Sequence, residues 1–354
     1  MKYKNILIVR TDRIGDVVLT LPLIQVLRKN YPDARITFLV RSYTKDVVEG
    51  QPDLDEVILY DEEGSRKRFF AMAFELRRSN FDLAIVAFPR FRVALLLLLA
   101  GVTTTVGSGY RWYSFLFTDR VLEHRKTAQK HEFEFNLSLA RKIGCLIGPE
   151  DIPYLMVQER AREAAIQERK RLGLSTKDGL VILHPGSGGS ARDWSATNFG
   201  TLAGRLADLG WKVVVTGATG EEGLVNQVIK ESGNRAYSSV GRMSLAQLVA
   251  FIAFADLLAA NSSGPLHIAA ALGIPVIGFF PPIVACSVER WGPVTQKKVV
   301  FVPDRTKCPL CKGDVCRSNV CMDQISVEQV VDALRQLVGR KKVSKKPRNV
   351  LVNS

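Results

Sequence analysis

The sequence has no apolar run long enough to cross a membrane. Its longest stretch without a polar side chain, residues 93–102, is about half of the ~20 residues that a spanning helix requires. No apolar leader with a small-residue cleavage site follows Met1, so we expect a cytoplasmic protein that is not exported. Since 47% of the residues are hydrophobic, a disordered or fibrous chain is also excluded. The length of 354 residues predicts two globular domains.

Acidic residues are few relative to basic ones, 35 against 49, which gives a net charge of +14. Residues 340–348, R-K-K-V-S-K-K-P-R, hold six basic residues and no acid, which leaves +8 for the rest. This surplus favours anionic ligands or the inner face of a membrane as partners; a solubilising tail is an equal alternative. Interleaved aromatics and DNA-reading motifs are missing, so we expect no nucleic-acid partner.

Four of the six cysteines lie close together near the carboxyl end. Cys308, Cys311, Cys316 and Cys321 have the spacing C-x2-C-x4-C-x4-C, and such short spacers let thiolates converge on zinc. A zinc ribbon usually separates its two cysteine pairs by about 12 or more residues, so the match is partial. A reduced loop or a local disulfide is preferred to a metal site, and we expect neither a bound metal nor a cofactor.

Short β-branched runs alternate with amphipathic stretches, the pattern of parallel sheets with crossover helices. It occurs twice. Strands are predicted at residues 5–9, 35–40, 56–59, 83–87 and 104–107, with helices at 17–30, 66–78, 91–100 and 131–143. The second set has strands at 180–183, 212–216, 257–260, 275–279 and 299–302, with helices at 159–171, 197–209, 221–231, 244–254, 265–272 and 326–338. The fold class is therefore α/β, with two doubly wound, Rossmann-like domains facing a central cleft.

The first candidate motif, R-T-D-R-I-G-D at residues 10–16, directly follows a predicted strand. Its single Gly15 is not the G-x-G-x-x-G of a dinucleotide site, so an ordinary NAD site is excluded. Asp16 stands at the start of a helix, where a carboxylate can cap free N–H groups. The alternative is that Asp16 removes a proton from an acceptor hydroxyl. Spacing alone favours the cap.

The second motif, H-P-G-S-G-G-S-A-R-D-W at residues 184–194, also follows a strand. Its glycines let backbone N–H groups approach an anion, and Ser187 and Arg192 add donors. The Walker sequence G-x-x-x-x-G-K-[ST] is missing, so phosphoryl transfer on a P-loop is disfavoured. A loop that binds phosphate is the favoured interpretation, and a flexible connection is the alternative.

The third motif, N-S-S-G-P-L-H at residues 261–267, runs from a strand into a helix. Ser262, Ser263 and the following free N–H groups form a helix start suited to phosphate. Ser263 as a simple N-cap and His267 as a packing residue are the alternatives. After another strand, Glu221 lies where a carboxylate can accept from ribose hydroxyls.

Together, the three motifs resemble glycosyltransferase family 9, which contains the ADP-heptose:lipopolysaccharide heptosyltransferases. The residues that carry the resemblance are R-T-D-R-I-G-D-V-V-L-T-L-P at 10–22, H-P-G-S at 184–187 with D-W at 193–194, and N-S-S-G-P-L-H-I-A-A-A-L-G-I-P at 261–275. The resemblance implies the GT-B architecture: an acceptor-binding domain at 1–155, a nucleotide-sugar-binding domain at 173–325, a helix at 326–339 that packs back on the first domain, and a basic tail at 340–354.

The resemblance also implies a role for particular residues. Asp16 matches the family's proposed catalytic base, so catalysis becomes the favoured interpretation for it. The implied donor-binding residues are Ser187, Gly188, Arg192, Glu221, Ser262, Ser263, Gly264 and His267. Arginines of the first domain are expected to bind the anionic acceptor: Arg10, Arg13, Arg90, Arg92 and Arg111. Family members often have Asp where this chain has Ser262, so the resemblance leaves the donor sugar open.

The function that the resemblance implies is inverting, metal-independent transfer of heptose from ADP-heptose to a lipopolysaccharide core acceptor at the inner membrane. Two alternatives are kept. One is a related transferase that uses another nucleotide sugar, such as a UDP-linked N-acetylhexosamine. The other is a nonenzymatic protein with the same architecture that binds a nucleotide sugar or a lipid.

Overall fold

The computed structural model describes residues 3–61, 66–189, 192–304, 306 and 320–339. The chain forms two compact units, Met1–Leu155 and Met156–Ser354. The basic tail and three clustered cysteines, Cys308, Cys311 and Cys316, lie outside the described residues. Within the described ranges, no helix is both long and apolar enough to cross a bilayer.

The first unit is built on a six-stranded parallel sheet with the order β3-β2-β1-β4-β5-β6. This is the strand order of dinucleotide-binding folds, in which the order reverses between the two central strands and ligands bind beyond their carboxyl ends. Those central strands, β1 and β4, are almost fully buried. The strands are β1 Asn5–Val9, β2 Arg35–Val40, β3 Glu56–Leu59, β4 Leu83–Val86, β5 Thr104–Ser108 and β6 Asp119–Val121.

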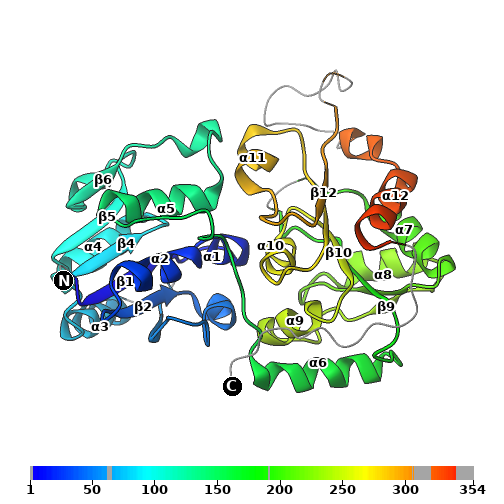
Figure 1. The fold of residues 1–354 in the computed structure, drawn as a ribbon, viewed down its shortest axis with the longest axis horizontal. Coiled ribbons are helices and arrows are strands. Elements are labelled where there is room, and N and C mark those ends of the chain that lie inside the picture. Colours follow the sequence, from blue (N-terminus) through cyan, green and yellow to red (C-terminus); the bar gives the residue numbers. More distant parts are fainter. Residues whose placement is uncertain (1–2, 62–65, 190–191, 305, 307–319, 340–354) are drawn as a thin grey trace. The chain divides into compact units, whose positions relative to one another are not determined.

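Helices cover both faces of this sheet (Figure 1). Alternate side chains of β1, including Leu7 and Val9, pack with Phe69, Leu76 and Leu97 in one hydrophobic core. The elements of this core layer include α3 and α4, whereas α2 and α5 pack together on the other face. The helices are α1 Ile14–Val18, α2 Pro22–Asn30, α3 Arg66–Arg78, α4 Phe91–Ala100 and α5 Glu132–Lys142.

The second unit repeats this plan with the order β12-β11-β10-β7-β8-β9. Here the order reverses between β7 and β10, which are the two strands that precede the second and third sequence motifs. The strands are β7 Leu180–His184, β8 Lys212–Val215, β9 Tyr237–Ser238, β10 Leu257–Asn261, β11 Val276–Phe279 and β12 Lys298–Phe301. Two parallel, helix-covered sheets confirm the predicted α/β class.

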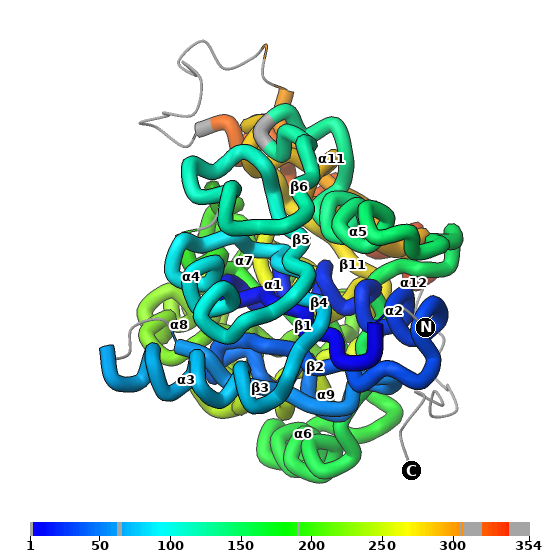
Figure 2. Tube along the Cα trace, turned by 90° about the vertical axis from the view of Figure 1, so that its left-hand side faces the viewer, coloured from blue at the N-terminus to red at the C-terminus, as the bar shows by residue number. Residues whose placement is uncertain are grey.

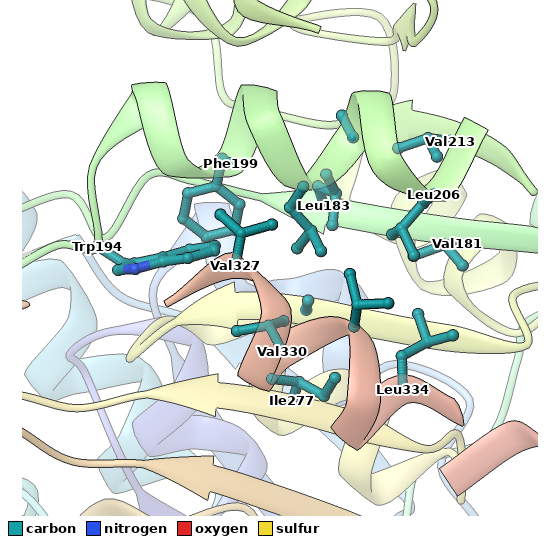
Figure 3. Close-up of a cluster of buried hydrophobic side chains, with 14 of the residues drawn as sticks. Val181, Leu183, Trp194, Phe199, Leu206, Val213, Ile277, Val327, Val330 and Leu334 are labelled. Atoms are coloured by element: carbon teal, nitrogen blue, oxygen red, sulfur yellow. The ribbon is translucent and has the colours of Figure 1, made fainter. Parts of the chain in front are cut away.

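The core of the second unit contains Trp194, whose ring stacks on Phe279 with 4.3 Å between the centroids. Figure 3 shows Trp194 and Phe199 beside the side chains of the final helix. The helices of this unit are α6 Glu159–Arg171, α7 Ala196–Asp208, α8 Glu222–Glu231, α9 Leu245–Ile252, α10 Gly264–Ala271, α11 Val288–Trp291 and α12 Val327–Val338.

The predicted helix at 17–30 is wrong as one element, because the chain breaks it into α1 and α2. Pro22 stands at the start of α2, where its missing N–H costs nothing but where a continuous helix would lose a hydrogen bond. The sequence also fails to predict β6 and β9. These edge strands have three and two residues, too few for an alternating pattern.

The position of α12 differs from the expectation that it packs on the first domain. Val330, Val331 and Leu334 of α12 are buried with Val181 and Leu206 in the core of the second unit (Figure 3). This side of α12 is therefore used to cover the second sheet. Its amphipathic pattern predicted a buried face but not the sheet that buries it.

We expect Leu334→Ala to destabilise the protein by about 2–5 kcal/mol, because the truncation leaves a cavity in the core of the second unit. The free energy of unfolding is measured by urea denaturation followed by tryptophan fluorescence, which reports on the buried Trp194. Gln336→Ala, at an exposed position of the same helix, is the matched control and should change it by less than about 0.5 kcal/mol. Equal effects of the two substitutions would contradict the placement of α12.

Candidate active site

The three motifs lie at the carboxyl ends of central strands. Residues 10–16 follow β1, residues 184–194 begin at the end of β7, and residues 261–267 begin at the end of β10. β7 and β10 are hydrogen-bonded neighbours, so the second and third motifs share one edge of the second sheet. Each motif therefore occupies the ligand-binding edge of its own unit.

A buried arginine organises the first motif. Arg10 is 1% exposed, and its guanidinium contacts three carboxylates. Nε lies 2.7 Å from Asp12 Oδ1, Nη1 lies 3.2 Å from Glu132 Oε1, and Nη2 donates to Asp16. Charged residues are almost never fully buried unless they are paired. This cluster therefore fixes the Asp16 carboxylate relative to the sheet.

The charges of this cluster shift one another's pKa values. Burial disfavours the charge of Arg10, but the three carboxylates more than offset it and hold the pKa of Arg10 above its usual value. Burial, with smaller contributions from Asp16 and Glu132, raises the pKa of Asp12 to about 7, although Arg10 opposes the shift.

Polar contacts from α5 hold the short helix that carries Asp16. Asn136 Nδ2 donates to the Leu19 carbonyl at 3.1 Å and to Thr20 Oγ1 at 3.0 Å. Thr20 Oγ1 in turn donates to the Asp16 carbonyl at 2.7 Å. Arg13 is the N-cap residue of α1 and Asp16 lies in its first turn, with a side chain that is 15% exposed. Asp16 is thus both anchored and reachable from solvent.

The structure differs from the expectation that Arg10 binds the acceptor, because its guanidinium is enclosed by the carboxylate cluster. Arg13, Arg90 and Arg111 are exposed and follow β1, β4 and β5, three adjacent strands of one sheet. Arg92 lies on α4, and its Nε donates to the Tyr60 hydroxyl at 3.2 Å. It lines a pocket of about 280 Å³ together with Tyr60, Arg68, Phe69 and Glu75.

In the second unit, the buried amide of Asn261 ties two motifs together. Asn261 Nδ2 donates to the Pro185 carbonyl at 2.6 Å, and its Oδ1 accepts from the Trp194 backbone N–H at 2.8 Å. Trp194 is itself fixed by its ring, whose Nε1 donates to the Ile325 carbonyl at 3.0 Å. These contacts set the backbone on both sides of Arg192, which is half-buried.

Glu221 lies against the glycine loop. A Cβ atom added to Gly186 would approach Glu221 Oε1 to 2.1 Å, so only glycine permits this contact. Glu221 Oε2 accepts from the Ala218 N–H at 2.7 Å, which orients the carboxylate. Gly188 and Gly189 have φ of 59° and 71°, in the left-handed region that glycine adopts without strain. The loop thus presents backbone close to a fixed carboxylate.

Asp193 and His184 complete the charged surroundings of this loop. Burial raises the pKa of Asp193 to about 6, and Glu221 adds to the shift while a hydrogen bond from Ser187 opposes it. Burial lowers the pKa of His184 to about 4, against the attraction of Glu221. His184 Nδ1 lies 3.0 Å from Thr216 Oγ1. A neutral His184 beside acidic residues is therefore expected near pH 7.

The start of α10 contains an unsatisfied hydroxyl. Ser263 is the N-cap residue of α10, but its side chain makes no capping hydrogen bond. Among the described residues, its buried Oγ has no hydrogen-bond partner. Gly264 begins the helix beside Ser262, whereas His267 is 5% exposed and packs in the interior. The alternative interpretation of Ser263 as a simple N-cap is therefore not supported, and its predicted role in binding phosphate stays a prediction.

The structure brings most predicted donor residues to one sheet edge. Ser187 and Gly188 follow β7, Glu221 follows β8, and residues 262–264 follow β10. Sequence analysis missed the roles of Asn261, Asp193, Asp12, Glu132 and Asn136. The sequence signal for three of these residues was their position inside the motifs: Asp12, Asp193 and Asn261. Glu132 and Asn136 lie more than 100 residues from Arg10 and carried none.

The described part of the chain contains no group of three or more His, Cys, Asp or Glu side chains arranged to hold a metal ion. Cys321, from the cysteine cluster, is 1% exposed and packs in the core of the second unit. The other three cysteines of that cluster lie beyond the described residues.

We expect Arg10→Met to destabilise the protein by about 3–5 kcal/mol, because Asp12 and Asp16 would lose their ion pairs with Arg10, while Glu132 would keep its ion pair with Arg125. Arg13→Met removes an exposed arginine from the same loop and should change the free energy of unfolding by less than about 0.5 kcal/mol. Urea denaturation of both variants provides the comparison. If Arg10→Met lowered the free energy of unfolding as little as Arg13→Met does, the cluster would not stabilise the fold.

Asp193→Asn is expected to change the pH dependence of stability. A carboxyl group whose pKa is raised to about 6 in the folded state binds a proton that the unfolded chain has released. Its contribution is therefore favourable below about pH 4 and declines as the pH rises towards 6. The free energy of unfolding of the variant, minus that of the wild type, should increase across this window. Parallel curves would contradict the raised pKa.

The chain is similar to known proteins along most of its length. Residues 69–321 match the model of glycosyltransferase family 9 (heptosyltransferase). The chain is 29% identical over 313 residues to a Haemophilus influenzae protein whose name specifies neither donor nor acceptor, covering 86% of this chain and 90% of that protein. It is 25% identical to lipopolysaccharide heptosyltransferase 2 of Escherichia coli K12, and the match covers 78% of this chain and 83% of that protein.

Among solved structures, the chain is similar to an E. coli ADP-heptose lipopolysaccharide heptosyltransferase II. The TM-score is 0.78 at 23% identity, and the match covers 94% of this chain and 98% of that one. The two Rossmann-like units are those of the GT-B architecture. On the family match, which spans most of its length, this chain belongs to glycosyltransferase family 9 and is a glycosyltransferase.

Proposed function

We propose that the protein transfers heptose from ADP-heptose to a lipopolysaccharide core acceptor, with inversion and without a metal ion. The observation that carries this proposal is the set of donor groups at one edge of the second sheet, where Asn261 joins the glycine loop to the Arg192 segment. The names of the relatives support the heptose donor and the lipopolysaccharide acceptor. A cytoplasmic protein that binds the inner face of the membrane fits such a lipid-linked acceptor.

In the proposed reaction, an acceptor hydroxyl attacks the anomeric carbon of the donor while the bond from that carbon to the diphosphate oxygen breaks. Asp16 accepts the hydroxyl proton, and ADP leaves with the bonding electrons. Negative charge develops on the leaving phosphate, where Arg192, the amides near Gly188 and the Ser263 hydroxyl act as fixed donors. One such donor is worth about 3–4 kcal/mol in other enzymes.

Glu221 is assigned to the ribose of ADP. Its carboxylate is already oriented by the Ala218 N–H at 2.7 Å, so it can accept from ribose hydroxyls without a large rearrangement. Gly264 contributes its backbone at the phosphate, and Ser262 lies beside the sugar. His267 is buried on α10, so we assign it to packing beneath this loop.

Acceptor recognition is assigned to exposed arginines of the first unit. Arg13, Arg90 and Arg111 offer guanidinium groups to anionic groups of a lipopolysaccharide core. Arg92 lies in a pocket beside Arg68 and supplies a fourth contact. Arg10 acts indirectly, as a positioning residue that holds Asp16.

Because of Ser262, a second class of sugar donor has to be tested. Many family members have Asp at this position, and a hydroxyl in its place removes one negative charge beside the sugar. A UDP-linked N-acetylhexosamine is therefore the alternative donor.

The test is acceptor-dependent release of nucleoside diphosphate by the purified full chain. ADP-heptose and UDP-N-acetylglucosamine are supplied in turn with a truncated lipopolysaccharide acceptor, and we expect release only from ADP-heptose. Asp16→Asn should lower kcat by about 10²- to 10⁴-fold, the usual contribution of a general base, with little change in the KM for the donor.

Glu123→Gln removes a partly buried carboxylate of the first unit that takes no part in the proposed chemistry, and it serves as the control. Release of UDP, without release of ADP, would show that the donor is UDP-N-acetylglucosamine and not ADP-heptose. Full activity of Asp16→Asn would remove the proposed base, and saturable donor binding without transfer to this acceptor would remove the acceptor assignment.

A further inference from the structure

One face of α3 is unusually apolar for a surface helix. Phe69, Ala73 and Leu76 point into the core, as expected for an amphipathic helix. The opposite side exposes Phe70 and Phe74, which are 61% and 63% accessible to solvent. These two rings are one helical turn apart and so lie on the same face. Folding of the first unit leaves both in water.

Basic residues flank this pair of rings at both ends of α3. Arg66, Lys67 and Arg68 occupy its first turn, and Arg77 and Arg78 its last; all five are exposed. Glu75 is the helix's single acid, so α3 carries a net charge of +4. Cations in a first turn oppose the helix dipole, which stabilises anions there. Arg77 and Arg78 in the last turn are favourable to the dipole, but the three cations of the first turn are not, so helix stability does not account for those three.

Neighbouring elements extend the apolar surface. Figure 2 shows α3 and α4 side by side, and the two helices are packed against each other. On α4, Leu98 is 54% exposed. In the segment after β5, Trp112 is 74% exposed and stacks on Phe91 with 5.0 Å between the ring centroids. We call this surface the α3–α4 face, made of Phe70, Phe74, Phe91, Leu98, Leu99, Trp112 and Phe115.

The members of the α3–α4 face belong to one layer. Their elements contribute buried residues such as Leu76, Leu97 and Phe117 to the same core cluster, against the same side of the sheet. The exposed residues of these elements therefore face away from that core. Phe and Trp side chains surrounded by Lys and Arg are the composition of surfaces that enter the interface of an anionic bilayer, where rings reach the acyl boundary and cations meet lipid phosphates.

We infer that the α3–α4 face docks the protein on an anionic phospholipid bilayer. The charge of α3 favours a bilayer over a second copy of the chain as the partner of this face. Two copies of a helix with net charge +4 repel each other, whereas anionic headgroups attract it. α3 follows β3, so its basic first turn lies towards the carboxyl edge of the sheet that also carries Asp16. A lipid-linked acceptor in that bilayer would have its sugars near this edge.

This inference deepens the membrane part of the proposed function, and its test is kept separate from sugar transfer. The full chain is sedimented with vesicles of phosphatidylethanolamine and phosphatidylglycerol, and with vesicles of phosphatidylcholine. We expect binding to the anionic vesicles only. The double variant Phe70→Ser/Phe74→Ser should bind them at least tenfold more weakly. Leu146→Ser, which alters a 76% exposed leucine of the first unit outside this face, should bind as the wild type does.

A chain that ends at Gly339 separates this face from the basic tail. We expect the shortened chain to retain binding that Phe70→Ser/Phe74→Ser still reduces at least tenfold, and Lys67→Glu/Arg78→Glu to reduce it similarly. Unchanged thermal unfolding midpoints would show that the variants fold, since the substituted side chains are exposed. Equal binding of anionic vesicles by Phe70→Ser/Phe74→Ser and by the wild type would overturn the inference. It would also be overturned if the wild type formed dimers that these substitutions dissociate.

Transfer activity then distinguishes the two proposals. If both hold, Phe70→Ser/Phe74→Ser should transfer normally to a detergent-dispersed acceptor and poorly to the same acceptor in vesicles. Vesicle binding that depends on these rings, in a protein without transferase activity, would remove the proposed reaction and leave the docking surface in place. Transfer that is equally fast to both acceptor forms in this variant would overturn docking alone.

Discussion

Buried polar side chains fix the strand-exit loops that carry the candidate site residues. In a parallel sheet, the carboxyl ends of neighbouring strands bring distant segments to one edge, but the loops there lack regular backbone partners. Asn261 satisfies groups of Pro185 and Trp194. Arg10 plays the corresponding part in the first unit, where it holds Asp12, Asp16 and Glu132. Each site is positioned by a side chain that has little access to solvent itself.

Much of this architecture could be predicted because its signals are local. Buried parallel strands are short β-branched runs, and the motifs stand directly after them, so both sheets and the strand exits follow from the sequence. β6 and β9 could not be predicted, since two or three residues carry no period. The sheet that α12 packs against could not be predicted, because an apolar helix face can pack in the core of one unit as well as the other.

The role of Arg10 shows the limit of reasoning from residue type. A surplus of arginine near a ligand site predicts exposed cations that bind anions, and Arg13, Arg90 and Arg111 are exposed in this way. Arg10 has the same chemistry, but Glu132 and Asn136 enclose it from a helix far along the chain. Only the tertiary fold separates a cation that binds ligand from one that positions a carboxylate.

Two buried polar groups of the second unit reduce its stability. A buried hydroxyl without a hydrogen bond costs about 1–3 kcal/mol, and Ser263 Oγ is such a group among the described residues. Asp193 is a second such cost, because burial disfavours its charged form and raises its pKa to about 6. The folded protein therefore retains two polar costs at this edge of the second sheet, one at Ser263 and one at Asp193.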